Sequence, residues 1–446
     1  MRLFFQEYLR DYKNLNLESK ILFLLSISVF LPTVFSNILL LISVFVYISK
    51  KTEIIVFKNY SLILLLLYFL LIFLSYFISI NPEITLKSIP RNVFLVFVPL
   101  FLTKTFYEKP SQKEIILNLY SIGCFFVILY FTLRACIRFL LTNDSSHFFF
   151  HGEYNNDYGL VPKELNAIHV SVFVAIAFLY LLQKEKKSKF EIFISFFFLL
   201  AIILLSSSVI IFSVALLSSI YYFFFSKAAN KMRLRNVVLL TIAIAGFSFY
   251  NKISKILEVE IKTNTQHNIG HNVINNIPDL DNKVTIYEAW NKEKFSQNDF
   301  FPGTAFRVYQ FRIFLEIIKE QDAFWTGLGF NASQQKIREK GVEYNVFQGN
   351  HHSEGYQNKN FHNQYLQVFS ELGFIGFALL IIILLFNLKT AIKNKDFLHI
   401  AFAILMISLF LTESFLSRQR GVVFFTVFYC LFTISNNTRY IKNNTK

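Results

Sequence analysis

The sequence is poor in charge and in cysteine, and these shortages exclude several classes of protein. Only 16% of the 446 residues are charged, against about 25% in soluble domains. Hydrophobic residues make up 54%, 56 residues are phenylalanine, and the mean hydropathy is +0.45. This composition excludes both a soluble enzyme and a disordered chain. The cysteines, Cys124, Cys136 and Cys430, lie in apolar runs without the spacing of a zinc site or a disulfide framework, so redox chemistry has no support.

Long apolar runs predict an all-α polytopic membrane protein. A helix needs about 20 mostly apolar residues to cross the roughly 30 Å hydrocarbon core of a bilayer. By that criterion we expect about twelve transmembrane helices, at 21–35, 37–49, 59–80, 89–106, 115–141, 166–182, 190–206, 209–225, 236–250, 370–388, 397–413 and 421–435. Because Pro32 and Asn37 separate two short runs, residues 21–49 could instead form a single kinked span.

Basic residues concentrate in every second connecting segment, as the positive-inside rule requires of cytoplasmic loops. These segments are 2–20, 50–58, 104–113, 184–189, 227–235, 389–395 and 439–446. We therefore expect both termini in the cytoplasm, and the net charge of +15 does not call for nucleic acid as a partner. The charged first 20 residues, followed by a long apolar region, do not predict a cleaved signal peptide.

One polar stretch, 251–362, is long enough to form a folded unit outside the membrane. We expect it to be a large exterior loop that contains short helices. It divides the chain into an N-terminal membrane part, 1–250, with about nine spans and a C-terminal part, 363–446, with about three.

Within this stretch, residues 264–303 are rich in Asn, Asp, Gln and Pro and favour irregular structure. Residues 306–324 predict an amphipathic helix, on the membrane surface or on the bundle, with Phe311, Phe314, Leu315 and Ile318 on its apolar face. The glycine pair of residues 327 and 329 is expected to end this helix.

Several polar side chains fall at the exterior ends of the predicted spans. His169 lies about one turn into 166–182, where a polar group has either a structural or a functional purpose. His351 and His352 adjoin but lack an acidic partner at a metal-binding spacing, so we expect no metal. Snorkelling accounts for each arginine singly, but a group of them would match the oxygens of a lipid-linked phosphate or diphosphate; they are Arg91, Arg134, Arg138, Arg307, Arg418 and Arg420.

The segment from Phe361 to Gly376 contains the pattern H-N-x-Y-L-Q followed by E-x-G-x-x-G. This segment resembles the O-antigen ligase and O-antigen polymerase family of bacterial membrane glycan transferases. Arg307, Phe311 and 327–329 also look like the arginine, aromatic and G-x-G run of that family, and 412–421 is similar to a segment joining its last two helices. Ser206, Ser207 and Ser208 depart from the family, because many members carry an arginine there.

The resemblance implies an inner-membrane enzyme with a periplasmic active face. It implies transfer of a glycan from undecaprenyl diphosphate to an acceptor hydroxyl, by inversion and without a metal or cofactor; its partners would be that donor, a glycan or lipid acceptor and the bilayer. His362 and Arg307 are the expected catalytic residues, and Arg91, Arg138, Arg418 and Arg420 are expected to bind diphosphate. Supporting roles fall to His169, Asn363, Tyr365, Gln367, Glu371, Gly373, Gly376 and Glu413.

Three functions remain open at this point. A ligase would pass the glycan to a surface acceptor, and a polymerase would pass it to another lipid-linked repeat unit. A transporter or flippase is disfavoured, since the spans show no inverted repeat and no acidic residues at their midpoints.

Overall fold

The structure is a computed structural model, and it describes the chain in nine stretches. These are residues 2–49, 60–108, 112–150, 159–162, 164–185, 187–205, 208–226, 282–350 and 354–444. In them, helices dominate and the only sheet has two strands. The membrane part contains α1 Arg2–Asn14, α2 Leu17–Ser28, α3 Thr33–Ser49, α4 Tyr60–Leu74, α5 Pro82–Ser88, α6 Phe94–Glu108, α7 Gln112–Thr142, α8 Ala167–Gln183, α9 Lys189–Leu205, α10 Ser208–Ile220, α16 Gln364–Lys393, α17 Phe397–Phe410 and α18 Gln419–Asn444.

Each predicted span that falls in the described residues overlaps at least one of these helices, and the span 21–35 extends across the break between α2 and α3. Among the described residues, four helical stretches are long and apolar enough to cross a membrane, namely Tyr60–Ile78, Pro82–Phe101, Gln112–Thr142 and Gln364–Lys393. Shorter apolar helices accompany them. Residues 21–49 form two helices, since α2 ends before Pro32 and α3 begins after it. The predicted span 236–250 lies outside the described residues.

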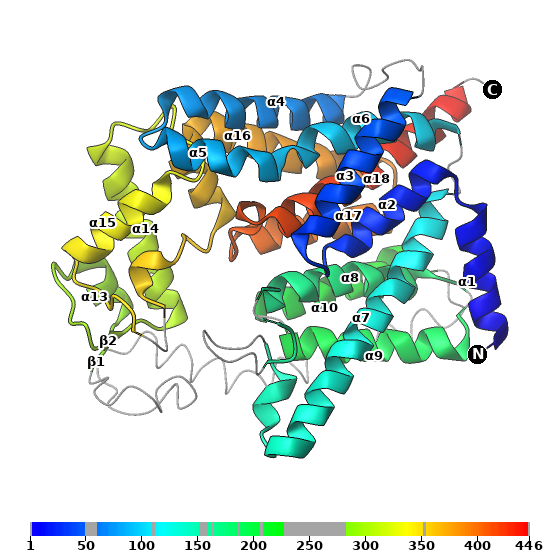
Figure 1. Cartoon of the computed structure of the whole chain (residues 1–446), viewed down its shortest axis with the longest axis horizontal. Helices are drawn as coiled ribbons and strands as arrows, with labels where there is room; N and C mark the ends of the chain where they lie inside the picture. Colours follow the sequence, from blue (N-terminus) through cyan, green and yellow to red (C-terminus); the bar gives the residue numbers. More distant parts are fainter. Residues whose placement is uncertain are drawn as a thin grey trace.

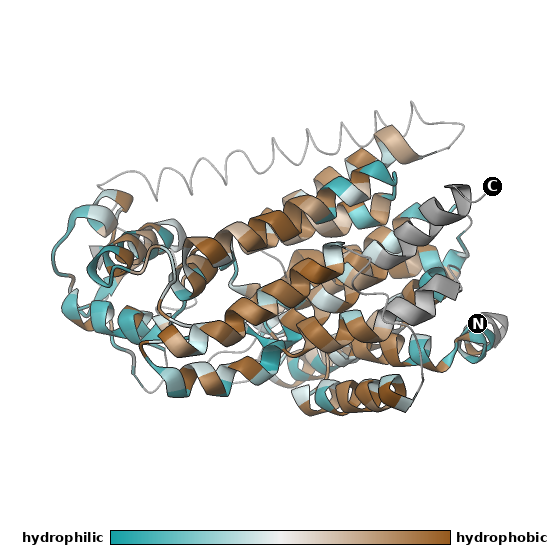
Figure 2. Ribbon diagram, turned by 90° about the horizontal axis from the view of Figure 1, so that it is seen from above, coloured by the Kyte–Doolittle hydropathy of each residue, from teal (hydrophilic) through white to brown (hydrophobic). Residues whose placement is uncertain are grey.

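The two membrane parts pack into one bundle rather than standing as separate units. Helix α18 packs against α6, α16 against α4, and α17 against α10, and these contacts share one continuous apolar core. The helices run along the long axis of the molecule, and both termini lie at one end of it (Figure 1). Hydrophobic residues cover the bundle, while hydrophilic ones gather toward its two ends (Figure 2).

A small unit with its own core stands at the other end of the bundle (Figure 1). It contains β1 Asn282–Lys283 paired in parallel with β2 Asp299–Phe300, and the helices α13 Ile286–Asn291, α14 Gly303–Glu320 and α15 Ser333–Glu343. We call residues 282–363 the extramembrane unit. Of the stretch 264–303, predicted to be irregular, residues 264–281 lie outside the described residues. The prediction is wrong at residues 286–291, because Thr285 and Glu288 form a reciprocal capping box that starts α13, and it is wrong at the two short strands.

The amphipathic helix is present as α14, and its buried face includes only half of the predicted one. Phe314 and Ile318 are buried as predicted, whereas Phe311 and Leu315 are 42% and 43% exposed. Tyr309, Ile313 and Ile317 complete the buried face. The helix is apolar around more than half of its circumference, so periodicity alone does not select the stripe that meets the core.

The glycine pair does not end α14, contrary to prediction. The helix stops at Glu320, and Asp322 takes the left-handed conformation two residues later, with φ +48°. Gly327 and Gly329 do have positive φ, but they lie where the extramembrane unit contacts the bundle, as described below.

Candidate functional site

The extramembrane unit meets the bundle where two glycine-containing segments lie backbone to backbone. The Leu328 amide donates to the Ser370 carbonyl at 2.9 Å, and the Gly329 amide donates to the Glu371 carbonyl at 3.0 Å. A Cβ on Gly327 would lie 2.4 Å from the Glu371 carbonyl carbon, and one on Gly373 would lie 2.2 Å from the Trp325 oxygen. Side chains at these glycines would therefore hold the two segments apart.

Gly373 also divides α16 into two helices. Its φ of 65° and ψ of −168° are a combination that only glycine adopts readily. The segment 364–372 therefore leaves the axis of the membrane helix and packs against the extramembrane unit. This change of direction sets how the H-N-x-Y-L-Q residues are oriented toward the bundle.

The H-N-x-Y-L-Q residues fasten this outer helix to α17 and to the loop between α17 and α18, residues 411–418. Asn363 caps the helix by accepting from the Tyr365 amide at 2.9 Å, and it donates to the Leu411 carbonyl at 3.2 Å. Gln364 accepts from the Leu416 amide at 2.6 Å, and the Tyr365 hydroxyl donates to the Ile407 carbonyl at 3.1 Å. These bonds bring the 411–418 loop beside His362.

His362 faces the carboxylate of Glu413. Its Nδ1 lies 3.9 Å from Glu413 Oε1, and the side chains are 35% and 9% exposed, so the imidazole is open while the carboxylate is enclosed. His362 has φ +45°, a strained conformation for a non-glycine residue. Its amide donates to the Asn360 side chain at 3.0 Å, and the Phe306 ring lies beside it with centroids 6.3 Å apart.

Glu413 interacts electrostatically with several neighbouring side chains. The pKa of its carboxyl lies below the ordinary value: burial alone would raise it, but the polar contact with His362 and the electrostatic interactions with His362, His169 and Arg418 outweigh burial. His169 is buried in the first turn of α8, with its ring 4.5 Å from that of Phe415. We call His362, His169, Glu413 and Arg418 the Glu413 cluster.

Arg418 and Arg420 differ in what they contact. The Arg418 side chain is exposed beside Glu413, and its guanidinium group interacts electrostatically with that of Arg420. Arg420 donates to the Glu164 carbonyl at 2.7 Å and to the Leu31 carbonyl at 3.2 Å, so it joins three segments of the bundle. Arg418 thus has donors to offer a ligand, whereas Arg420 uses several of its own on the protein.

Arg91 belongs to a second group of polar side chains, at the contact between bundle and extramembrane unit. Its guanidinium carbon lies 5.1 Å from the Phe330 ring centroid, and it interacts electrostatically with the buried carboxylate of Glu371. Glu371 also accepts hydrogen bonds from Gln367 and from Ser333. In the described part of the chain no hydrogen bond, ion pair or ring contact joins this group to His362.

The remaining predicted arginines have local contacts. Arg138 donates to the Gly159 carbonyl at 3.4 Å. Arg307 is exposed on α14, next to Phe306, and donates to the Gly303 carbonyl at 3.2 Å. Lys359 is a further cation near His362 that was not predicted, and its ammonium group lies 5.6 Å from the Phe306 ring centroid. Its place three residues before His362 was the available signal.

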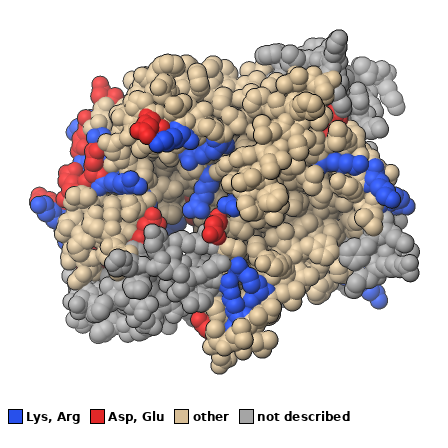
Figure 3. Space-filling view, viewed as in Figure 1, with Lys and Arg blue, Asp and Glu red and all other residues tan. Residues whose placement is uncertain are grey.

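A recess in the molecular surface separates the extramembrane unit from the bundle in Figure 3, and Lys and Arg side chains line it. Within the described residues, no group of three His, Cys, Asp or Glu side chains could hold a metal. The arrangement offers an open imidazole, an enclosed carboxylate and guanidinium donors, which together can accept a proton and stabilise an anion.

Comparison with known proteins adds one match. Residues 166–381 match the sequence model of a family described as O-antigen ligase, and this range includes His169, Arg307, His362 and Glu371. Curated proteins gave no match to this chain.

Proposed function

This chain belongs to the O-antigen ligase family, and from that premise we propose that it transfers a glycan from undecaprenyl diphosphate to an acceptor hydroxyl. The family and the apolar helices make it a membrane protein that processes glycans, with a lipid-linked glycan as the substrate class. The observation that carries the finer proposal is the open imidazole of His362 against the enclosed carboxylate of Glu413, with Arg418 beside it.

In this reaction the acceptor oxygen bonds to the anomeric carbon as the bond from that carbon to the diphosphate breaks. His362 takes the acceptor proton at Nε2, because Nδ1 faces Glu413. The imidazolium that forms is stabilised by the Glu413 carboxylate, as in other histidine–carboxylate pairs. A single displacement inverts the configuration of the anomeric carbon.

The departing diphosphate gains negative charge, and guanidinium groups stabilise it without a metal. Arg418 is the first candidate because it is exposed and adjoins Glu413. On the extramembrane unit, the candidates for binding the diphosphate are Arg307 and Lys359. Both adjoin Phe306, whose ring lies beside His362. We propose that Arg91 stabilises the buried carboxylate of Glu371 and does not bind the diphosphate. The active face is the end of the bundle that carries the extramembrane unit, and we propose that it is periplasmic.

Reconstitution in vesicles with a glycan on undecaprenyl diphosphate tests the proposal. His362→Gln should reduce transfer by about 10²-fold or more, the usual contribution of a general base. His147→Gln is the matched control, since His147 contacts Thr142 at 2.8 Å away from the cluster. Full transfer by folded His362→Gln protein refutes the assignment, and loss of transfer with a chelator refutes metal independence.

The acceptor class requires a cellular measurement. Deletion of the gene should leave lipid-linked polymer unattached if the acceptor is a surface lipid, which defines a ligase. Surface glycan with only one repeat unit instead defines a polymerase.

A further inference from the structure

An apolar cavity of about 480 Å³ lies on the flank of the bundle, between α9 and α10 and in front of α8. Phe196, Leu199 and Ile203 line it from α9, and Val214 and Ala215 line it from α10. Phe196 and Ile203 are more than half exposed, so the cavity opens through the apolar surface that faces the bilayer. The molecules next to such an opening are the lipids of the bilayer, so a lipid acyl chain is the expected ligand.

The polar side chains of the cavity gather at one end. Lys187, Ser218 and Tyr222 line it there, and the neighbouring Tyr221 hydroxyl donates to the Gln183 carbonyl at 3.2 Å. This is the end of the bundle at which α9 begins beside α1, opposite the extramembrane unit (Figure 1). The cavity is therefore remote from His362. We call its apolar part between α9 and α10 the shaft, and its polar end at Lys187, Ser218 and Tyr222 the mouth.

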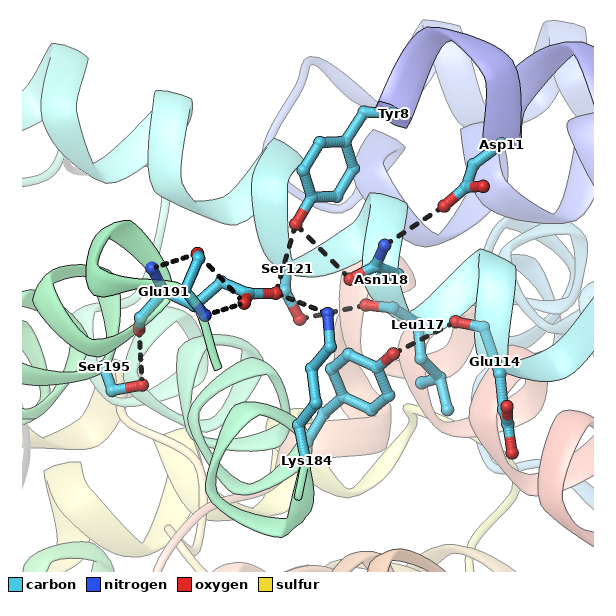
Figure 4. A network of polar contacts seen from close by, with 11 residues as sticks. Tyr8, Asp11, Glu114, Leu117, Asn118, Ser121, Lys184, Glu191 and Ser195 are labelled. Carbon is cyan, nitrogen blue, oxygen red and sulfur yellow. Dashed lines mark hydrogen bonds and ion pairs between the residues drawn. The ribbon is translucent and has the colours of Figure 1, made fainter. Parts of the chain in front are cut away.

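The two lysines near this mouth are in different electrostatic situations. Lys184 pairs with Glu191, which also accepts from the Tyr8 hydroxyl in the network of Figure 4. Lys187 donates to the Leu182 carbonyl at 2.9 Å, and no carboxylate of the described residues lies within ion-pair distance of its ammonium group. Burial lowers the pKa of Lys187, and the charge of Glu191 offsets this only in part, so an anion at the mouth would further stabilise the charged ammonium group.

We propose that this cavity binds one anionic phospholipid from the leaflet at the end of the termini, with an acyl chain between α9 and α10 and the phosphate at Lys187. The apolar shaft fits the chain, and the unpaired ammonium group with the Tyr222 hydroxyl fits the phosphate oxygens. The inference does not depend on the proposed function, because it uses none of the residues of the Glu413 cluster.

Native mass spectrometry of the full chain, released from vesicles of phosphatidylglycerol and phosphatidylcholine, tests this proposal. Wild-type protein should retain one phosphatidylglycerol molecule. Lys187→Ala should weaken that retention about fivefold, the usual effect of one lysine at an anionic surface. Ala215→Phe should abolish retention of either lipid by filling the shaft.

Two variants serve as matched controls. Lys189→Ala removes the same charge from an exposed position outside the cavity, and Leu216→Phe adds a ring next to Ala215 but outside the lining. Both should bind like wild type. Equal retention by all variants, equal retention of the zwitterionic lipid, or displacement of the bound lipid by undecaprenyl phosphate would overturn the proposal.

Discussion

Replacing Gly373 by alanine should undock the extramembrane unit from the bundle. The φ and ψ of Gly373 cost a non-glycine residue about 1–3 kcal/mol. The added Cβ would also lie 2.2 Å from the Trp325 oxygen, so the two backbones must separate. Separation breaks at least one buried bond, such as the 2.9 Å bond from the Leu328 amide to the Ser370 carbonyl, at about 1–3 kcal/mol. The total is a loss of about 2–6 kcal/mol in the docked state.

Two measurements report this loss. The temperature of half-inactivation in detergent should fall, and glycan transfer should drop at least tenfold because the outer helix of α16 no longer presents His362 to Glu413. Gly303→Ala is the control, since its Cβ would meet only the Arg307 guanidinium at 3.5 Å, and it should stay within about 0.5 kcal/mol of wild type. If Gly373→Ala matches this control in both assays, the docking argument is refuted.

Three further perturbations probe the charged groups of the site. Glu413→Gln should lower the half-inactivation temperature at pH 7. This difference should shrink as the pH falls below about 4.3, because a carboxylate with a lowered pKa stabilises above its ordinary pKa and loses this effect as the pH falls through the lowered value. A pH-independent difference contradicts this. Arg91→Met should destabilise the protein, and it should do so less in a Glu371→Gln background. A double-mutant cycle should give a coupling free energy of about 0.5–3 kcal/mol. Additive effects would show that the two side chains do not interact. Arg420→Ala should lower thermal stability by about 1–3 kcal/mol through its lost bonds to Leu31 and Glu164, while Lys389→Ala at an exposed position of α16 serves as the neutral comparison.

The sequence by itself determined the membrane helices and the family. Their signals are local: an apolar run of sufficient length forms a helix in lipid whatever its neighbours are, and the H-N-x-Y-L-Q and E-x-G patterns lie within 16 consecutive residues, 361–376. For the same reason, His362 could be predicted as a candidate from the motif alone. The sequence also left open whether Pro32 separates two helices, and the structure shows two, α2 and α3.

Tertiary structure alone decided which polar residues act together. Glu413 comes beside His362 only because Asn363 and Gln364 bind the 411–418 loop, and Arg91 comes beside Glu371 only because the glycine segments dock. Residues separated by 50 to 280 positions carry no shared pattern in one sequence. Phe311 and Leu315 were wrongly predicted to be buried in α14 for a related reason, since a helix apolar on several faces takes its buried side from the partners that fold against it.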